Sequence, residues 1–136
     1  LKNNMIWRGI MKITVIQSFY AMFYLLDNYY DQKKIDDLGA MLGSMSPDLF
    51  DGDMPADIAI WHEWLAIVKE VAQSDMEVDC LDDILAYESM LAFLNYYNRE
   101  FGVNIDIVIE DLAMRRVDTI NVQKMWQDAL EKANAH

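Results

Sequence analysis

The feature that most constrains the fold of this chain is a set of apolar residues that recur at intervals of three and four. They occupy one stretch near the N-terminus and are Ile16, Phe19, Phe23, Leu26 and Tyr30. This spacing puts the five side chains on one face of an α-helix, whereas the faces of a strand need strict alternation. Thr14 with Gln17 three residues later matches a capping box. The pattern predicts a helix from about Thr14 to Gln32.

Similar spacing predicts five more helices along the chain. Their expected ranges are 36–44, 55–73, 81–101, 104–114 and 121–133. Asp36 is the expected cap of the first, Pro55 lies in the first turn of the second, and Gly102 is the expected stop of the third. The buried face of the second is expected to be Ile58, Trp61, Trp64, Leu65, Val68 and Ala72. The segment 104–114 is ambiguous, because its isoleucines and valine would also suit a strand.

The two halves of the chain resemble each other at a constant offset. Residues 13, 16, 19, 22, 26 and 29 match similar residues 68 positions later, and Trp61 matches Trp126 at an offset of 65. Any two amphipathic helices align at some offset, so chance stays open as an alternative. If residues 81–134 repeat residues 13–73, the segment 104–114 corresponds to the helical segment 36–45 and is expected to be a helix. The predicted fold is all-α, a single-domain bundle of about six helices, with two pseudo-repeated three-helix halves as one option.

Composition and length agree with one helical domain over residues 13–136. The chain has only 5 Gly and 2 Pro, too few turn residues for a many-stranded protein. Residues 1–12 are expected to be an N-terminal extension without the features of a signal peptide, and Met11 looks like a natural start. The longest apolar run, 19–26, is far short of the roughly 20 residues of a membrane span. We therefore expect a cytoplasmic protein.

The negative charge is concentrated in the middle of the chain. Residues 35–83 contain 13 acidic residues against Lys69 alone, a net charge of −12, while the other 87 residues carry 10 acids and 10 bases and cancel. Such a segment repels nucleic acid and anionic membranes and attracts basic surfaces. Carboxylates also cap helices and keep proteins soluble, and that ordinary role is the alternative reading of the same residues.

Catalytic, metal and cofactor sites are not predicted. Two histidines and one cysteine cannot supply an ordinary zinc site, and His62 is expected on the surface. The loop 48–53 lacks the alternating ligands and closing Glu of a calcium loop. Cys80 is flanked by acidic residues that disfavour the reactive thiolate, so we read it as structural. No glycine-rich phosphate loop is present.

Aromatic residues that lie beside carboxylates are the second candidate feature of the sequence, after the acidic segment 35–83. The pairs Tyr29-Tyr30 and Tyr96-Tyr97 lie near the ends of the two long helices, and one member of each pair must turn toward the surface. Exposed Tyr and Trp beside carboxylates are typical of surfaces that bind Arg and Lys, although core packing is the alternative for each ring. The predicted partner-binding residues are Tyr29, Tyr30, Asp36, Asp37, Asp48, Asp51, Asp53, Asp57 and Trp61.

In size, acidity and lack of catalytic residues, the chain resembles the immunity proteins of bacterial toxin systems. The segments Tyr29-Tyr30-Asp31 and Asp36-Asp37-Leu38-Gly39-Ala40-Met41-Leu42-Gly43 look like the motif of such a family. The resemblance implies a non-enzymatic protein that neutralises a basic toxin domain, with the acidic residues facing Lys and Arg of the toxin.

Two other classes of function stay open. The ten methionines and the aromatic stripes could form a groove for a partner helix, as in an adaptor or an oligomeric scaffold, with a homodimer as one form. An enzyme is the third class, and no residue pattern supports it.

Overall fold

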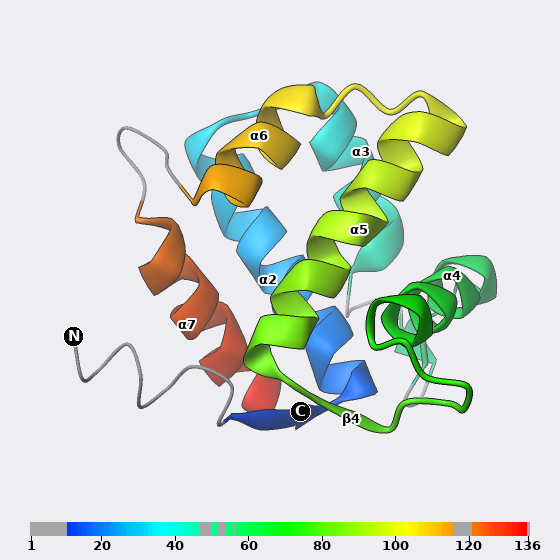
Figure 1. Cartoon of the computed structure of the whole chain (residues 1–136). Helices are drawn as coiled ribbons and strands as arrows, with labels where there is room; N and C mark the ends of the chain where they lie inside the picture. The colour runs from blue at the N-terminus through cyan, green and yellow to red at the C-terminus, as the bar shows by residue number, and fades with distance from the viewer. Residues whose placement is uncertain (1–10, 47–49, 52–53, 56, 116–120, 136) are drawn as a thin grey trace.

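Six helices and two very short antiparallel strand pairs make up the described part of the chain, residues 11–46, 50–51, 54–55, 57–115 and 121–135 (Figure 1). The helices are α2 (Val15–Gln32), α3 (Asp36–Met45), α4 (Ile58–Val71), α5 (Asp83–Phe101), α6 (Asp106–Met114) and α7 (Val122–Asn134). The strands are β1 (Lys12–Thr14), β2 (Phe50–Asp51), β3 (Met54–Pro55) and β4 (Cys80–Asp82). The prediction of an all-α bundle of about six helices is confirmed. The extension at 1–10 lies outside the described residues.

The start of α2 follows directly from its sequence. The Thr14 side chain accepts a hydrogen bond from the backbone N–H of Gln17 at 3.1 Å, and the Gln17 side chain accepts one from the Thr14 N–H at 3.0 Å. This reciprocal pair satisfies two N–H groups that a helix start leaves without partners. The predicted capping box is therefore confirmed.

The strands β1 and β4 join the starts of the two long helices. Ile13 lies opposite Leu81 in the antiparallel ladder, and both side chains are buried. Beyond the ladder, the N–H of Val15 donates to the carbonyl of Asp79, and the N–H of Asp83 donates to the carbonyl of Met11. The two bonds are equivalent, because Asp83 lies 68 positions after Val15 and Asp79 lies 68 positions after Met11. Ile13 and Leu81 are related by the same offset. The sequence pattern did not predict these strands.

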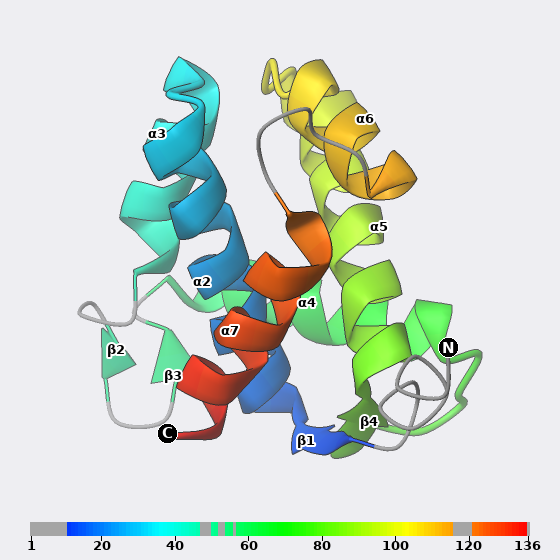
Figure 2. The ribbon, with the colours of Figure 1, turned by 90° about the vertical axis from the view of Figure 1, so that its left-hand side faces the viewer.

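The helices are arranged around this ladder in two similar sets. The long helices α2 and α5 both start at the ladder and run to the opposite end of the molecule, where α3 and α6 lie (Figure 2). Helix α7 packs on α2, and α4 packs on α5, so the last helix of each half contacts the first helix of the other. The chain thereby closes into one hydrophobic core.

Trp64 on α4 lies at the centre of this core. Its ring contacts Phe19 and Phe93 edge-on, at centroid distances of 6.0 and 5.6 Å. Its Nε1 donates to the hydroxyl of Ser18 at 3.1 Å, so the buried indole keeps a hydrogen-bond partner. Aromatic rings from both halves therefore position α4 against the two long helices.

Two predicted helix starts and one predicted helix cap are wrong. Helix α5 begins at Asp83, not at 81, because residues 80–82 pair with β1 and the Asp82 carboxylate caps the helix through the N–H of Leu85. Helix α4 begins at Ile58, because Pro55 pairs in β3 and Asp57 is the cap. Asp36 does not cap α3; Ile35 holds the N-cap position without a side-chain hydrogen bond.

The predictions for 104–114 and for the end of α5 are confirmed, whereas the predicted buried face of α4 is only partly confirmed, since Leu65 and Ala72 are half-buried. Residues 104–114 are helical from Asp106, and Gly102 ends α5 in the left-handed conformation (φ 63°) that glycine adopts readily. Ile58, expected in the core, is 48% exposed, because it is the first residue of α4 and Ile60 turns inward instead.

Candidate partner-binding groove

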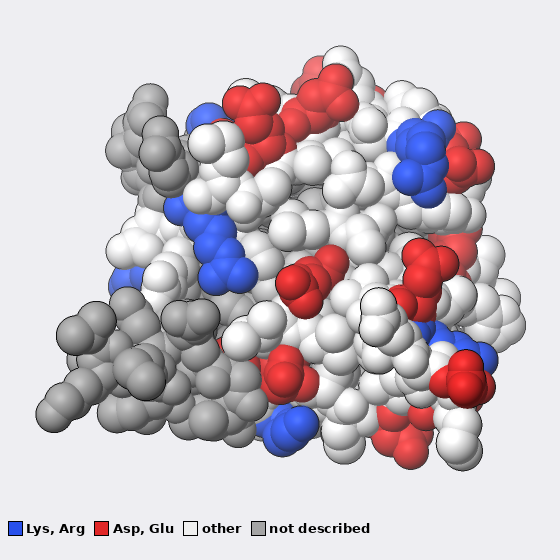
Figure 3. Space-filling model, in the orientation of Figure 1, with Lys and Arg blue, Asp and Glu red and all other residues white. Residues whose placement is uncertain are grey.

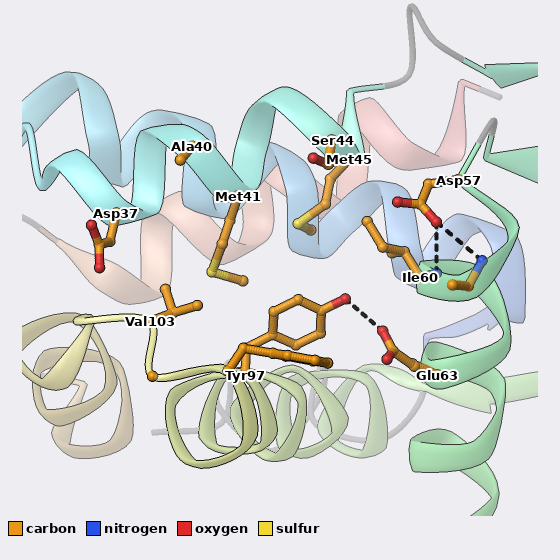
Figure 4. Close-up of a pocket in the computed structure, with 13 residues that line it drawn as sticks. Asp37, Ala40, Met41, Ser44, Met45, Asp57, Ile60, Glu63, Tyr97 and Val103 are labelled. Atoms are coloured by element: carbon orange, nitrogen blue, oxygen red, sulfur yellow. Dashed lines mark hydrogen bonds between the residues drawn. The ribbon is translucent and has the colours of Figure 1, made fainter.

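A groove with a volume of about 570 Å³ lies where α3, α4 and the C-terminal end of α5 meet (Figure 4). We call it the acidic groove, because three carboxylates line it: Asp37 on α3, Asp57 at the start of α4, and Glu63 on α4. No Lys, Arg or His is among the described residues that line it. The described lining of the groove therefore carries no positive side chain, and the basic residue Arg99 lines a neighbouring pocket together with Glu63.

The rest of the acidic groove is mostly apolar. Its apolar lining consists of Met41, Met45, Ile60, Phe101 and Val103, with the ring of Tyr97 on the α5 side. Met41 and Met45 are buried in α3 and point into the groove in Figure 4, while Phe101 is 57% exposed at its rim. Methionine side chains adapt to differently shaped partners, and an exposed Phe offers a contact surface. The groove thus combines charge with a surface suited to apolar contacts.

Neutral donors hold each carboxylate of the groove in place. Asp57 accepts hydrogen bonds from the N–H groups of Ala59 and Ile60 at 3.1 and 3.3 Å, and Asp37 accepts one from the N–H of Asn104 at 2.6 Å. Glu63 accepts a hydrogen bond from the hydroxyl of Tyr97 at 2.5 Å. Because these donors carry no formal charge, they orient the carboxylates without cancelling their negative charge.

Ion pairs lie elsewhere in the described part of the chain. They join Lys33 to Asp111, Lys34 to Asp31, Arg99 to Glu100, and Lys124 to Asp128. On the face shown in Figure 3, acidic side chains are spread over several elements with basic side chains between them. The acidic groove differs from this mixed surface because its described lining has carboxylates alone.

The hydroxyl of Tyr97 remains a proton donor to Glu63 across the ordinary pH range. Burial raises the pKa of Tyr97 well above its usual value, and the hydrogen bond to Glu63 and the charge of that carboxylate raise it further. Tyr96 lies beside it, with its ring edge-on at 5.8 Å and its hydroxyl 3.5 Å from the other Glu63 oxygen. Glu63 is thus held between two tyrosines on α5.

Two predicted partner-binding residues lie in the core instead of on the surface. Tyr29 is fully buried, and its hydroxyl donates to Asp111 at 2.6 Å. Trp61 is only 8% exposed and packs edge-on against Phe19. Exposed rings are not found at these two positions, because both lie on helix faces that the bundle covers. The alternative of core packing holds for both, and the prediction that Trp61 lies on the buried face of its helix is confirmed. Tyr30, which the sequence pattern placed on the apolar face, is half-buried beside Lys34 and is the outer member of its pair.

The structure brings together only part of the predicted acidic surface. Asp37 and Asp57 both line the acidic groove, and Asp36 is exposed in the first turn of α3. Asp51 lies in β2, and its side chain is not described. Asp48 and Asp53 lie outside the described residues. For Asp57 and Asp82 the alternative role as helix caps is confirmed.

Sequence reasoning missed Glu63 and Tyr97 as members of the candidate site. They are 34 positions apart and meet only because α4 packs on α5. The tyrosine pair Tyr96-Tyr97 was a visible signal, but nothing local indicated which carboxylate it would contact. His62 on α4, considered above as a metal ligand, is exposed. The free Cys80 in β4, considered above as a reactive thiol, is exposed as well.

Comparison with known proteins does not assign this groove. The chain matches no protein-family model, and searches of curated proteins and of solved structures found no match. Within the described residues, no group of three or more His, Cys, Asp or Glu could hold a metal ion. None of the described helices combines the length and the hydropathy of a membrane-crossing segment.

Proposed function

We propose that this protein is a non-enzymatic interaction protein that binds and neutralises a basic protein partner through the acidic groove, as an immunity protein does against a bacterial toxin. The observation that carries the proposal is the charge of the groove, where Asp37, Asp57 and Glu63 meet without a basic residue in the described lining. Complementary charge accelerates association and disfavours acidic partners. The apolar lining then supplies contacts that persist once the partner is bound.

The proposal is tested with two variants of equal net charge. The groove variant carries Asp37→Asn, Asp57→Asn and Glu63→Gln in the groove, together with Asp36→Asn beside it on α3. Asparagine also caps helices, so α4 keeps its cap at position 57. The control variant neutralises four exposed acids outside the groove, with Asp75→Asn, Glu77→Gln, Glu110→Gln and Glu131→Gln. Each variant loses four negative charges from the −12 of the wild type.

The measurement is capture of partners from a lysate of the native host, followed by mass spectrometry. The wild type and the control variant should retain the same basic protein, and the groove variant should release it. If the groove variant retains that protein as well as the wild type does, the proposal is wrong. The captured protein can then be tested for toxicity in a host with and without this chain.

An adaptor that holds a partner helix is the second candidate, favoured by Met41, Met45 and the exposed Phe101 in the same groove. Salt separates the two functions. Between about 0.1 M and about 1 M salt the screening length falls from about 10 Å to about 3 Å. Charge-led binding should weaken markedly over that range, whereas binding dominated by apolar contacts should change little.

A further inference from the structure

The two long helices each place a tyrosine hydroxyl on a carboxylate, but only one of these pairs includes a cation. Tyr29 on α2 and Tyr97 on α5 correspond at the offset of 68. Tyr29 donates to Asp111 at 2.6 Å, and Lys33 contacts the same Asp111 oxygen at 3.1 Å. Tyr97 donates to Glu63 at 2.5 Å. Among the described residues, no Lys, Arg or His forms an ion pair with Glu63.

The missing cation has a clear sequence origin. Lys33 follows Tyr29 by four positions, one helical turn, and the residue four positions after Tyr97 is Phe101. The nearby Arg99 is paired with Glu100 at 3.1 Å. Tyr29 and Tyr97 therefore hold equivalent positions on α2 and α5, although their carboxylates come from different helices, α6 and α4. One turn later, α5 has an exposed aromatic ring where α2 has its lysine.

We propose that the acidic groove receives one arginine side chain of a basic partner, with its guanidinium paired to Glu63 and stacked on the ring of Phe101. This rests on the proposed function and names the side chain that the groove recognises. Glu63 and Phe101 line the same groove, and Tyr97 touches both, since its ring lies 5.0 Å from that of Phe101. The incoming arginine supplies a cation beside Glu63, as Lys33 supplies one beside Asp111.

Arginine fits this site better than lysine does. Its planar guanidinium can donate to a carboxylate and stack on an aromatic face at the same time, whereas an ammonium group is a compact, strongly hydrated charge. The ring of Phe101 is held by Tyr96 and Tyr97, at centroid distances of 5.7 and 5.0 Å, and is 57% exposed. Met41 on the opposite wall can cover the methylene groups of the arginine stem.

The test is an NMR titration of the ¹⁵N-labelled protein with N-acetyl-arginine amide, and in parallel with the lysine and norleucine analogues. The arginine probe should produce saturable shifts at the amides of Glu63, Phe101 and Gly102. It should bind about threefold tighter than the lysine probe, the effect expected of one stacking contact at an exposed site. The norleucine probe, which has no charge, should produce no saturable shift.

Three variants separate the contributions of the two residues. Glu63→Gln should weaken arginine binding by about tenfold or more, because a charge-assisted hydrogen bond is lost. Phe101→Leu should keep binding and abolish the preference for arginine over lysine. Phe101→Lys places an ammonium group at the position equivalent to Lys33, where it should pair with Glu63 and block the probe. Glu77→Gln, an exposed acid outside the groove, is the control and should bind as the wild type does.

Amide spectra of each variant show directly whether the fold is intact, so loss of binding is not confused with unfolding. The inference is wrong if the wild type shows no saturable shift, or if folded Glu63→Gln binds the arginine probe as tightly as the wild type. It is also wrong if the captured partner tolerates Glu63→Gln but not Asp37→Asn with Asp57→Asn, although the proposed function would then stand. If the probe binds at Glu63 but no basic protein is captured, the proposed function fails and the arginine site stands.

Discussion

The hydroxyl of Tyr29 donates to Oδ2 of Asp111 at 2.6 Å and so joins α2 to α6 across 82 positions of sequence. The tyrosine is fully buried, whereas Lys33, which contacts the same oxygen, is 37% exposed in its side chain. The buried donor is expected to contribute more to stability than the exposed ion pair, because solvent screens the lysine.

Tyr29→Phe should therefore lower the free energy of unfolding by about 1.5–3 kcal/mol, the range for a hydrogen bond to a charged group. Lys33→Met should lower it by less than about 1 kcal/mol. Urea denaturation at pH 7 measures both. A larger loss for Lys33→Met than for Tyr29→Phe would contradict this order.

The two glycines of α3 should respond in opposite directions to alanine. A Cβ at Gly43 would meet nothing within 4 Å, so Gly43→Ala should stabilise the protein by about 0.5–1 kcal/mol through helix propensity. A Cβ at Gly39 would lie 2.8 Å from Cε1 of Tyr30. Gly39→Ala should therefore destabilise the protein, by about 1–3 kcal/mol for an overpacked contact.

The Tyr30 ring itself provides the control for this pair. In a Tyr30→Ala background the contact is absent, and Gly39→Ala should become stabilising. Thermal unfolding of the wild type, the two single variants and the double variant measures the change of sign. If Gly39→Ala destabilises equally in both backgrounds, its effect does not come from the ring of Tyr30.

Alkaline pH should destabilise the protein through Tyr87. Burial raises its pKa from 10 to about 12, although the Arg115 guanidinium above the ring opposes the shift. The hydroxyl donates to the carbonyl of Leu112 at 2.7 Å. Below pH 10 the tyrosine is protonated in both states and its contribution is complete. Between pH 10 and 12 the unfolded state loses the proton first, so stability falls as pH rises.

For a shift of this size, the loss from Tyr87 is about 1.4 kcal/mol at pH 11. Urea denaturation of the wild type and of Tyr87→Phe, from pH 8 to pH 11, should show a shallower fall for the variant by about that amount. Tyr29 and Tyr97, whose pKa values are also raised, remain in both proteins and leave a common background slope. Parallel curves for the two proteins would contradict the prediction.

The capping box of α2 should be worth about 1 kcal/mol. Thr14→Ala removes the acceptor for the Gln17 N–H and should lower the free energy of unfolding by about 0.5–2 kcal/mol. Thr14→Ser keeps the hydroxyl, so most of the stability should return. If Thr14→Ser is as unstable as Thr14→Ala, the loss comes from the pairing of Thr14 in β1 and not from the cap.

How far the sequence predicted the fold depends on the range of the interactions involved. The extent of α2 and the end of α5 at Gly102 were predicted closely, because capping, glycine geometry and helical spacing act within four or five residues. The start of α5 was missed, because β4 forms only when a segment about 68 positions away lies beside it. Pro55 was misplaced for a different reason, because it pairs in β3 with Phe50, a close neighbour in sequence, instead of starting α4.

For the candidate site, the sequence by itself determined that the middle of the chain is acidic and that tyrosine pairs lie near the ends of both long helices. Only the tertiary structure decided which tyrosine of the first pair, Tyr29, is the core residue, and that Asp37, Asp57 and Glu63 meet beside Tyr97 and Phe101. Helical periodicity specifies which side chains share a face of one helix. Which carboxylate meets which ring depends on how the helices pack together, and that is decided by the core as a whole.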